Sequence, residues 1–296
     1  MAVLKCKNVS KSFKTNKVLE NVNLTLKQGK IYGLIGRNGV GKTTLLSILT
    51  AQMPADSGTV TLDGIPVWEN REALKHICFS REINTVTAFG PNNMKIKEYF
   101  KIAALYNPGW DQEYADRLIE DFKLDIKKKV KQLSKGMLSM VTIIVGLASK
   151  ADITILDEPV AGLDVVAREK FYKLLIEEQS ETDRTFVVST HIIEEAADVF
   201  EEVIFLHDKG ILLEENTMEL LDRSVYVSGL KDAVEKAVEG MNVVSKENMG
   251  KSMAVTVLLD EEPGTGRVTR IVRNQDITVQ PVSLQNLFVA MCGKEN

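Results

Sequence analysis

The sequence predicts an α/β fold: a core of alternating strands and helices, interrupted by a helical insertion and followed by a small α+β domain. Three observations predict it. An apolar run near the N-terminus leads through a glycine-rich loop into a helical pattern. Residues from about 92 to 148 are mostly helical in pattern. Strand–helix alternation resumes after them, so we expect domains at residues 1–222 and 223–296.

Composition is typical of a globular protein with a sizeable core, since 44% of the 296 residues are hydrophobic and 26% are charged. The net charge of −4 argues against a nucleic-acid binder. The three cysteines, Cys6, Cys78 and Cys292, are odd in number and scattered, which favours reduced thiols over disulfides or a zinc site. No apolar run is long enough for a signal peptide or a membrane helix, so we expect a soluble, cytoplasmic chain.

The N-terminal part predicts one βα unit flanked by antiparallel strands. The run KIYGLIG reads as a buried strand, and GKTTLLSILTAQM continues with helical periodicity until Pro54. The alternating runs AVLKCKNVSKSF, VLENVNLTLKQG and GTVTLDG read as the antiparallel strands.

The later part predicts further alternation. Helices are expected for IKEYFKIAALY, DQEYADRLIEDFKL, VVAREKFYKLLIEEQS and IIEEAADVF, and strands for ITILDEP and TFVVST. The run EVIFLHDKGILLEE reads as a hairpin. The tail then supplies a strand VYVSGL, a helix KDAVEKAVEG, a strand AVTVLL, a turn EEPGTG, a strand ITVQ and an amphipathic SLQNLFVAM.

A phosphate-binding loop is predicted between the first buried strand and its helix. GRNGVGKTT fits the pattern G-x-x-x-x-G-K-[ST] in the strand–helix context that the pattern requires. Its N–H groups and the helix N-terminus can bind the phosphates of a nucleoside triphosphate. Lys42 is then expected at the terminal phosphates and the Thr43 hydroxyl on Mg²⁺. The predicted phosphate-binding residues of this loop are Gly36, Arg37, Asn38, Gly39, Val40, Gly41, Lys42, Thr43 and Thr44.

A second part of the site is predicted where ITILDEP ends in two acids. Asp157 is expected to hold Mg²⁺ together with Thr43. Glu158 is expected to polarise the attacking water as a general base. Acids at strand ends are usually solvated, so the assignment depends on the glycine-rich loop.

In order along the chain, the phosphate loop, LSKGM, ITILDEP, AGLD and STH resemble the ATP-binding subunits of ABC transporters over about residues 1–222. Within the family the chain is most similar to bacterial exporter ATPases for peptide antibiotics, bacitracin-like compounds or phenol-soluble modulins; LYNPGWD and PVSLQNLFVAM also resemble that group. The resemblance implies a P-loop NTPase of the ABC-ATPase fold, with a RecA-like core, an antiparallel β subdomain and a helical subdomain at about 92–148. It also implies ATP hydrolysis with Mg²⁺.

The resemblance gives LSKGM the role of the family signature, usually LSGGQ. In the family, two subunits pack head to tail and each signature closes over the nucleotide of the other. Ser134 would then donate its hydroxyl, and Gly136 its N–H, to the partner's ATP. The alternative is that Ser134 only caps the helix. Lys135 and Met137 depart from the family pattern, which puts the strength of closure in question.

Further roles follow from the resemblance alone. Phe13 corresponds to an aromatic that stacks on adenine; the alternative is a core aromatic on a short strand. Asp164 in AGLD corresponds to a residue at the dimer seam. His191 in STH corresponds to a catalytic residue that contacts the γ-phosphate, in the company of Lys42 and Glu158.

The family glutamine that touches Mg²⁺ is missing from ICFSREIN. Glu82 takes its place as a candidate metal ligand, and Ser80 is a weaker candidate. The segment from there to about Tyr106 is expected to form the groove that receives a short helix of a membrane subunit.

The expected partners are separate transmembrane permease subunits and a second ATPase, in a homodimer or heterodimer, with no nucleic acid. The chain would therefore lie at the cytoplasmic face of the membrane and energise export of a peptide or another amphipathic compound. Two alternatives stay open: a non-transport ABC ATPase and an ATP-sensing regulator. Repair and chromosome-organising members carry a long coiled coil before the signature, whereas here no sustained heptads precede Leu133.

Overall fold

The computed structural model describes residues 3–83, 91–259 and 276–293. They form two compact units, Met1–Glu214 and Glu215–Asn296. The expected domain boundary at residue 222 lies inside the second unit, at the end of its first helix, α7 (Thr217–Asp222). The expected turn EEPGTG, and residues 84–90 of the expected membrane-subunit groove, lie outside the described residues.

A six-stranded sheet forms the centre of the first unit, in the order β10-β9-β3-β8-β7-β6. Its strands are β3 (Ile31–Ile35), β6 (Ile77–Arg81), β7 (Ile153–Asp157), β8 (Thr185–Thr190), β9 (Glu202–His207) and β10 (Gly210–Asn216). β3 pairs in parallel with β8 and β9, and β7 pairs in parallel with β6 and β8. The carboxyl ends of these strands therefore meet at one edge, and β3, β7 and β8 are buried along their whole length, as central strands of a parallel sheet are.

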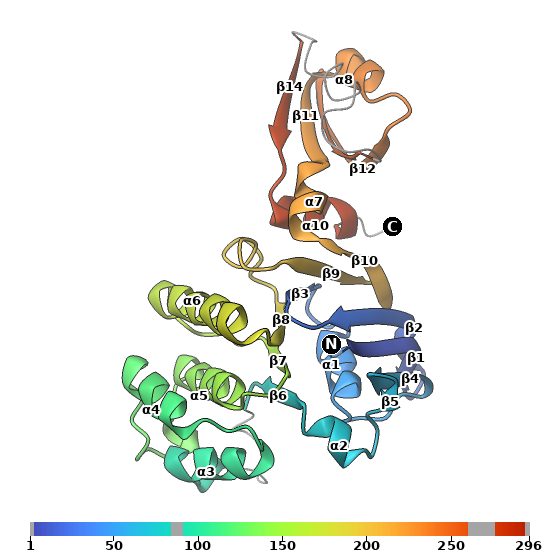
Figure 1. Cartoon of the computed structure of the whole chain (residues 1–296). Helices are drawn as coiled ribbons and strands as arrows, with labels where there is room; N and C mark the ends of the chain where they lie inside the picture. The colour runs from blue at the N-terminus through green and yellow to red at the C-terminus, as the bar shows by residue number, and fades with distance from the viewer. Residues whose placement is uncertain (1–2, 84–90, 260–275, 294–296) are drawn as a thin grey trace. The chain divides into compact units, whose positions relative to one another are not determined.

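An antiparallel sheet lies on one side of this centre, in the order β2-β1-β4-β5. Its strands are β1 (Val3–Phe13), β2 (Asn16–Lys27), β4 (Ser57–Leu62) and β5 (Ile65–Pro66), and α2 (Arg71–Leu74) leads on to β6. Between the two sheets lies α1 (Lys42–Leu49) (Figure 1). Its leucine and isoleucine side chains share one core with residues of both sheets, so burial fixes the start of α1 beside the end of β3.

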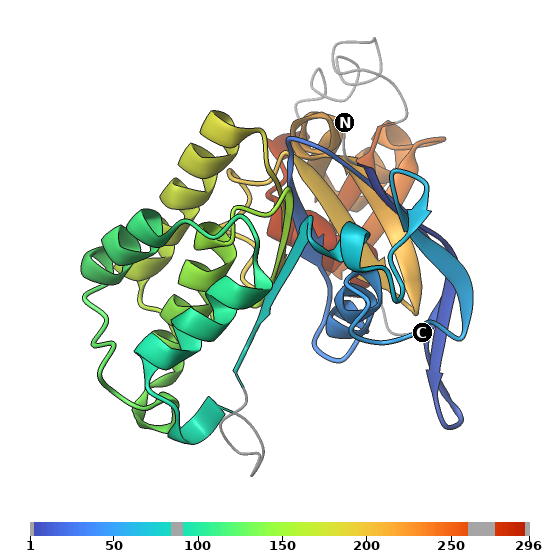
Figure 2. The same cartoon turned by 60° about the horizontal axis from the view of Figure 1, so that its bottom comes forward.

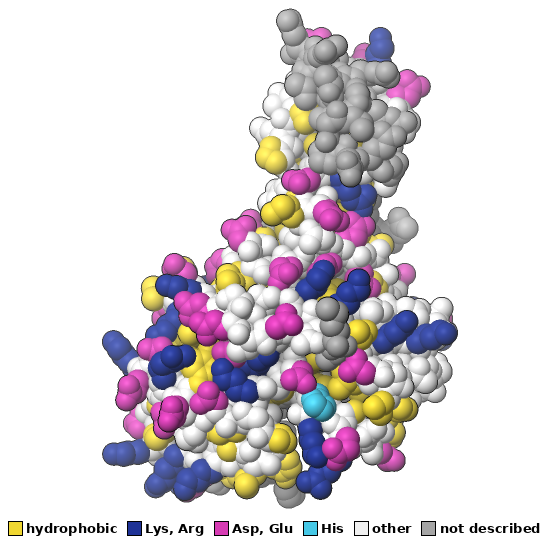
Figure 3. Space-filling model, viewed as in Figure 1, with side chains coloured by type: hydrophobic (Ala, Val, Ile, Leu, Met, Phe, Trp, Pro, Cys, Tyr) yellow, Lys and Arg dark blue, Asp and Glu magenta, His cyan; other side chains and the backbone are white. Residues whose placement is uncertain are grey.

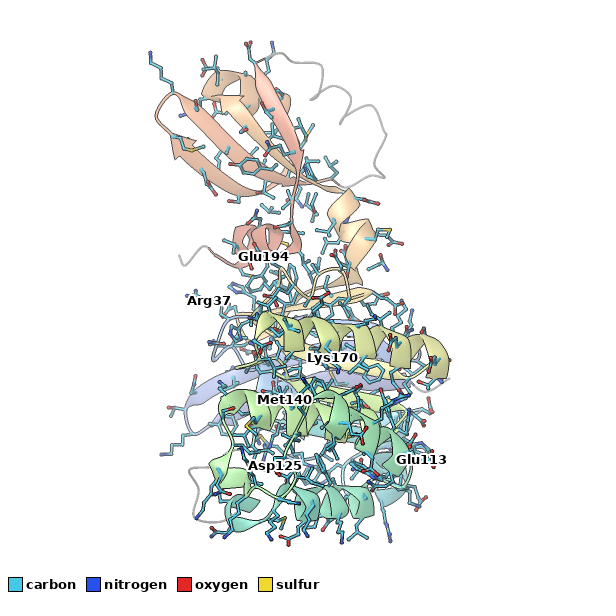
Figure 4. All side chains as sticks on the ribbon, turned by 90° about the vertical axis from the view of Figure 1, so that its left-hand side faces the viewer. Arg37, Glu113, Asp125, Met140, Lys170 and Glu194 are labelled. Carbon is cyan, nitrogen blue, oxygen red and sulfur yellow. The ribbon has the colours of Figure 1, made fainter. Side chains whose placement is uncertain are left out.

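A group of helices covers the other side of the six-stranded sheet (Figures 1 and 2). These are α3 (Ile96–Tyr106), α4 (Gln112–Asp121), α5 (Lys135–Ala148) and α6 (Val165–Thr182). Figure 4 shows them stacked, with Lys170 on α6 and Met140 on α5. α5 is apolar through most of its length because it is packed between the sheet and the other helices. At Gly146 a Cβ would lie 2.6 Å from Leu156 Cδ2, so glycine permits this close helix–strand contact.

One predicted helix is wrong. IIEEAADVF forms consecutive turns rather than a helix, closed by i→i+3 bonds from Ala196 N to Ile193 O and from Val199 N to Ala196 O. Tertiary packing overrides the helical propensity, because Ile193, Ala196 and Phe200 are all buried. The Phe200 ring occupies the space beside Gly33, where a Cβ would lie 2.2 Å from the ring.

The second unit is an antiparallel sheet in the order β12-β13-β11-β14. Its elements after α7 are β11 (Ser224–Leu230), α8 (Lys231–Ala237), β12 (Asn242–Met249), β13 (Ser252–Leu258), β14 (Ile277–Pro281) and α10 (Leu284–Cys292). Seven buried side chains form its core: Val227, Val234, Val238, Met253, Val255, Val257 and Leu259. The α+β character is as predicted, but β12 is a strand that the sequence did not indicate.

Two further findings concern the membrane and the charge of the surface. No helix among the described residues combines the length and the apolar character needed to cross a membrane. On the face of the first unit drawn in Figure 3, acidic and basic side chains are interspersed.

Candidate active site

The loop between β3 and α1 has the backbone that a phosphate-binding loop requires. Gly39 and Gly41 have φ values of 81° and 116°, in the region that favours glycine. A Cβ at Gly36 would lie 2.8 Å from the backbone oxygen of Leu206, so this position is also confined to glycine. Gly41 precedes α1 without a side chain that could cap its first N–H groups. These N–H groups lie at the positive end of the helix dipole, which favours binding of an anion.

Lys42 lies across this loop rather than in solvent. Its side chain is 7% exposed, and Nζ donates to the Gly36 carbonyl at 2.7 Å. Nζ also lies 3.4 Å from Glu158 Oε1. The ammonium is therefore held between the glycine loop and the acid at the end of β7, where it can contact a phosphate in the loop. Arg37, in contrast, is at the exposed outer part of the loop (Figure 4).

Asp157 ends β7 and is buried. Thr43 Oγ1 donates to its Oδ2 at 2.6 Å, and Ser189 Oγ donates to its Oδ1 at 2.5 Å. Within the described part of the chain, no group of three or more histidine, cysteine or acidic side chains is arranged to hold a metal ion without other ligands. Mg²⁺ usually takes one or two carboxylates and completes its shell with phosphates and water, so the Thr43–Asp157 oxygen pair fits it.

Glu158 follows Asp157 in an unusual backbone conformation. Its φ of 50° is in the left-handed region, which costs a non-glycine residue about 1–3 kcal/mol. Its N–H donates to Ser189 Oγ at 3.0 Å and lies 3.2 Å from Ser189 O, which stabilises this backbone conformation. Strain of this kind is found where side-chain direction matters, and here the carboxylate lies between Lys42 Nζ and the histidine that follows β8.

That histidine is His191. Its Nδ1 lies 2.7 Å from Glu158 Oε2, and its side chain is about half exposed. β3, β8 and β7 are neighbours in the sheet. Their carboxyl ends therefore bring Lys42, Asp157, Glu158 and His191 together, at the edge where ligands bind in open α/β sheets. Sequence reasoning missed Ser189, which contacts both acids. The feature that could have identified it is its position in STH, next to the last residue of β8.

The predicted signature residues form a second group. Ser134 caps α5, because its Oγ accepts from Met137 N–H at 3.3 Å. A Cβ at Gly136 would lie 2.5 Å from Gly162 O, so the start of α5 packs directly on the backbone of AGLD. Ser139 Oγ strengthens this contact by donating to Ala161 O at 2.6 Å. The close approach at Gly136 therefore favours glycine within this chain, whatever Gly136 contacts in a second subunit.

Asp164 and Phe13 lie at exposed ends of their elements. Asp164 caps α6, accepting from Ala167 N–H at 2.8 Å, and is followed by two exposed valines. Phe13 ends β1 and is 45% exposed, with Lys11 Nζ 5.9 Å from its ring centroid. It pairs with Asn16 at the start of β2, and Val18 of the same strand lies 3.0 Å from a Cβ placed at Gly41. The hairpin end that carries Phe13 therefore lies near the glycine loop.

Glu82 follows β6 and is also exposed. Its Oε1 lies 3.5 Å from Lys135 Nζ. Ser80, the weaker candidate at this position, is buried and donates to the Thr142 carbonyl of α5 at 2.7 Å.

Known proteins resemble this chain, most of them over about 70–75% of its length and YtrB over 98%. The family model described as ABC transporter matches residues 19–161. The ABC transporter ATP-binding protein YtrB of Bacillus subtilis (strain 168) is 26% identical over 292 residues, 98% of both chains. AlbC of the same organism, also named as an ABC transporter ATP-binding protein, is 31% identical over 221 residues, 71% of this chain and 90% of its own. A dimeric ATP-binding cassette in a post-hydrolysis state with ADP and Pi superposes with a TM-score of 0.62 and 27% identity, over 72% of this chain and 98% of its own.

The names of relatives point to different cargoes. The lantibiotic transport ATP-binding protein SrtF of Streptococcus pyogenes is 29% identical over 232 residues, 75% of this chain and 97% of its own. The ribose import ATP-binding protein RbsA of Streptococcus agalactiae is 30% identical over 230 residues, 70% of this chain and 44% of its own.

Proposed function

The chain belongs to the family of ABC transporter ATP-binding proteins, and from this premise we propose that it energises export of a peptide or another amphipathic compound through separate membrane subunits. It is an ATP hydrolase of the ABC type, as its family is. The cargo and the direction are the proposed part. They are supported by the similarity to SrtF and by the sequence motifs that resemble exporters of antimicrobial compounds. The match to RbsA makes import the alternative.

The cluster at the carboxyl edge of the sheet would supply the ATP hydrolysis that drives this export. The glycine loop and α1 bind the triphosphate. Lys42 Nζ then gives up its contact with Glu158 and binds a terminal phosphate. Thr43 and Asp157 would hold Mg²⁺, which would neutralise phosphate charge there. Glu158 then accepts a proton from the attacking water, since its backbone conformation and His191 fix its carboxylate in place.

We propose that two cassettes enclose each nucleotide. Ser134 and Gly136 begin α5, whose N-terminal dipole favours an anion. Asp164 and the exposed Val165 and Val166 begin α6 beside them. A second copy, or a related ATPase, would cover these apolar side chains and place its own triphosphate at Ser134 and Gly136.

A groove on the same unit fits the membrane subunit. It has a volume of about 380 Å³ and is lined by residues of β6, α3 and the end of α1, among them Phe79, Tyr99 and Ile102. Beside it Leu105 and Tyr106 are 83% and 82% exposed. Exposed apolar side chains of this size mark interaction sites, and a short amphipathic helix would bury them.

Two measurements test the proposal. The tagged full-length chain is purified from detergent-solubilised membranes: a permease in the eluate supports a transport subunit, whereas DNA or ribosomes indicate a non-transport ATPase. The complex is then placed in inverted vesicles with MgATP outside. ATP-driven accumulation of a labelled lantibiotic-like peptide in the lumen supports export, and ATP-driven loss of preloaded solute indicates import.

A further inference from the structure

Two positions at which this sequence departs from its family contact each other. Glu82 stands where the family has glutamine, and Lys135 stands where the signature has glycine; Glu82 Oε1 and Lys135 Nζ are 3.5 Å apart. We propose that this ion pair is a coupling contact between the segment after β6 and the start of α5, and that it positions Ser134 and Gly136 for the nucleotide of a second subunit. The inference rests on the proposed function.

Lys135 is placed to transmit such a contact. It is the first residue of α5, between the capping Ser134 and Gly136. Its stem lies against the AGLD backbone, because a Cβ at Gly162 would be 2.8 Å from Lys135 Cγ and 3.0 Å from its Cβ. Because this packing holds the stem, a charge that attracts Nζ also shifts the N-terminus of α5.

Glu82 is placed to receive a displacement from the groove. Ile77, Cys78 and Phe79 of β6 line the groove, and Glu82 follows that strand directly. β6 is tied to α5 through the Ser80–Thr142 hydrogen bond and to β7 through the pairing of Arg81 with Asp157. A helix seated in the groove would therefore shift Glu82, and the ion pair passes that shift to Lys135.

The pair is suited to coupling rather than to stabilising the fold. The two side chains are 59% and 57% exposed, and exposed pairs change an equilibrium by a factor of only about 1.5 to 5. A contact of this strength can form and break within a transport cycle. It is also screened by salt, because both charges face solvent.

Charge reversal and restoration test the pairing. Lys135→Glu and Glu82→Lys are compared with the double variant that carries both changes, in the full-length chain. The matched control is Lys131→Glu, the same charge change at an exposed lysine shortly before the signature. Turnover of MgATP is measured against protein concentration, and hydrogen exchange is followed in residues 131–140.

Each single reversal is expected to raise the protein concentration for half-maximal turnover about three- to fivefold, and to speed exchange at the start of α5. The KM for ATP at saturating protein should change less than about twofold, since the phosphate loop is untouched. The double variant should return to within about twofold of the wild type, and the control should not differ from it.

The outcomes separate the two proposals. If the double variant is as defective as Glu82→Lys, Glu82 acts alone, for instance on the metal, and the coupling contact is refuted. Additive defects of the two single variants refute it as well. If the wild-type complex exports no peptide in the vesicle assay, the proposed function fails, while hydrogen exchange that is slow in the wild type and the double variant but fast in the single variants still supports the pairing.

Discussion

Replacing Gly136 with alanine tests how the signature is built. The new Cβ would lie 2.5 Å from the carbonyl oxygen of Gly162, whereas ordinary contact begins at 3.4 Å. The start of α5 and the AGLD backbone must therefore separate by about 0.9 Å. Backbone lies on both sides of this contact, so no side chain can rotate away to relieve it.

The expected magnitudes follow from two opposing effects. Overpacking costs about 1–3 kcal/mol. Alanine in place of glycine favours the helix by up to about 1 kcal/mol. The free energy of unfolding should thus fall by about 0–2 kcal/mol, which a domain of ordinary stability tolerates. The displaced backbone would lose a hydrogen bond to the partner's phosphate, worth about 1.5–3 kcal/mol, so association should weaken about 10- to 150-fold.

The assay compares Gly136→Ala with Gly210→Ala, a glycine where the nearest atom to a new Cβ is Glu20 O at 4.0 Å. Denaturant unfolding gives the free energy, light scattering with MgATP gives dimerisation, and a fluorescent ATP analogue gives binding to the monomer. We expect Gly136→Ala to bind the analogue normally and to fail in dimerisation. Dimerisation equal to that of Gly210→Ala, with both proteins folded, would refute the reasoning.

Three further predictions concern the catalytic edge and the pH dependence of stability. Glu158→Gln should lower MgATP turnover by about 10²–10⁴-fold, since the base is lost while the Lys42 contact with phosphate remains; unchanged phosphate release would remove Glu158 from that role. Ser189→Ala leaves a buried oxygen of Asp157 without its donor, so the free energy of unfolding should fall by about 1–3 kcal/mol and the Mg²⁺ concentration for half-maximal turnover should rise; denaturation and magnesium titration check both. Burial raises the pKa of Glu214 above its usual 4.5, against a backbone hydrogen bond from Thr25. Its ionised form therefore destabilises the fold as pH rises above 4.5, and Glu214→Gln should gain stability over wild type at neutral pH but not in acid, as thermal unfolding at both pH values would reveal.

The predictable part of the molecule is local or fixed by sheet topology. A buried strand, a glycine loop and a helix follow each other directly, so the phosphate loop can be identified from neighbouring residues. Asp157 and Glu158 could be placed together because they are adjacent at the end of one apolar strand, whereas His191 was placed with them by the family resemblance. The fold class is confirmed by the solved cassettes that resemble it.

The rest depends on packing that a sequence does not state. The stretch 192–200 has helical propensity, but burial of every third or fourth side chain is also satisfied by consecutive turns. β12 is mostly exposed and lacks a clear apolar alternation, so nothing marked it as a strand. The positive φ of Glu158 and the role of Ser189 arise from the pairing of β7 with β8, which brings distant residues together.

The contact between Gly136 and Gly162 explains why signature and AGLD loop are expected to act as one body. Gly162 has a φ of 79°, so it favours glycine by conformation, and Gly136 is confined to glycine by contact. Asp164, two residues on, caps α6, as Ser134 caps α5. The N-termini of the two helices are thus in direct backbone contact through Gly136 and Gly162. A nucleotide bound at Ser134 would therefore also displace Asp164. A displacement of Asp164 at the dimer seam would in turn move the signature through the same contact.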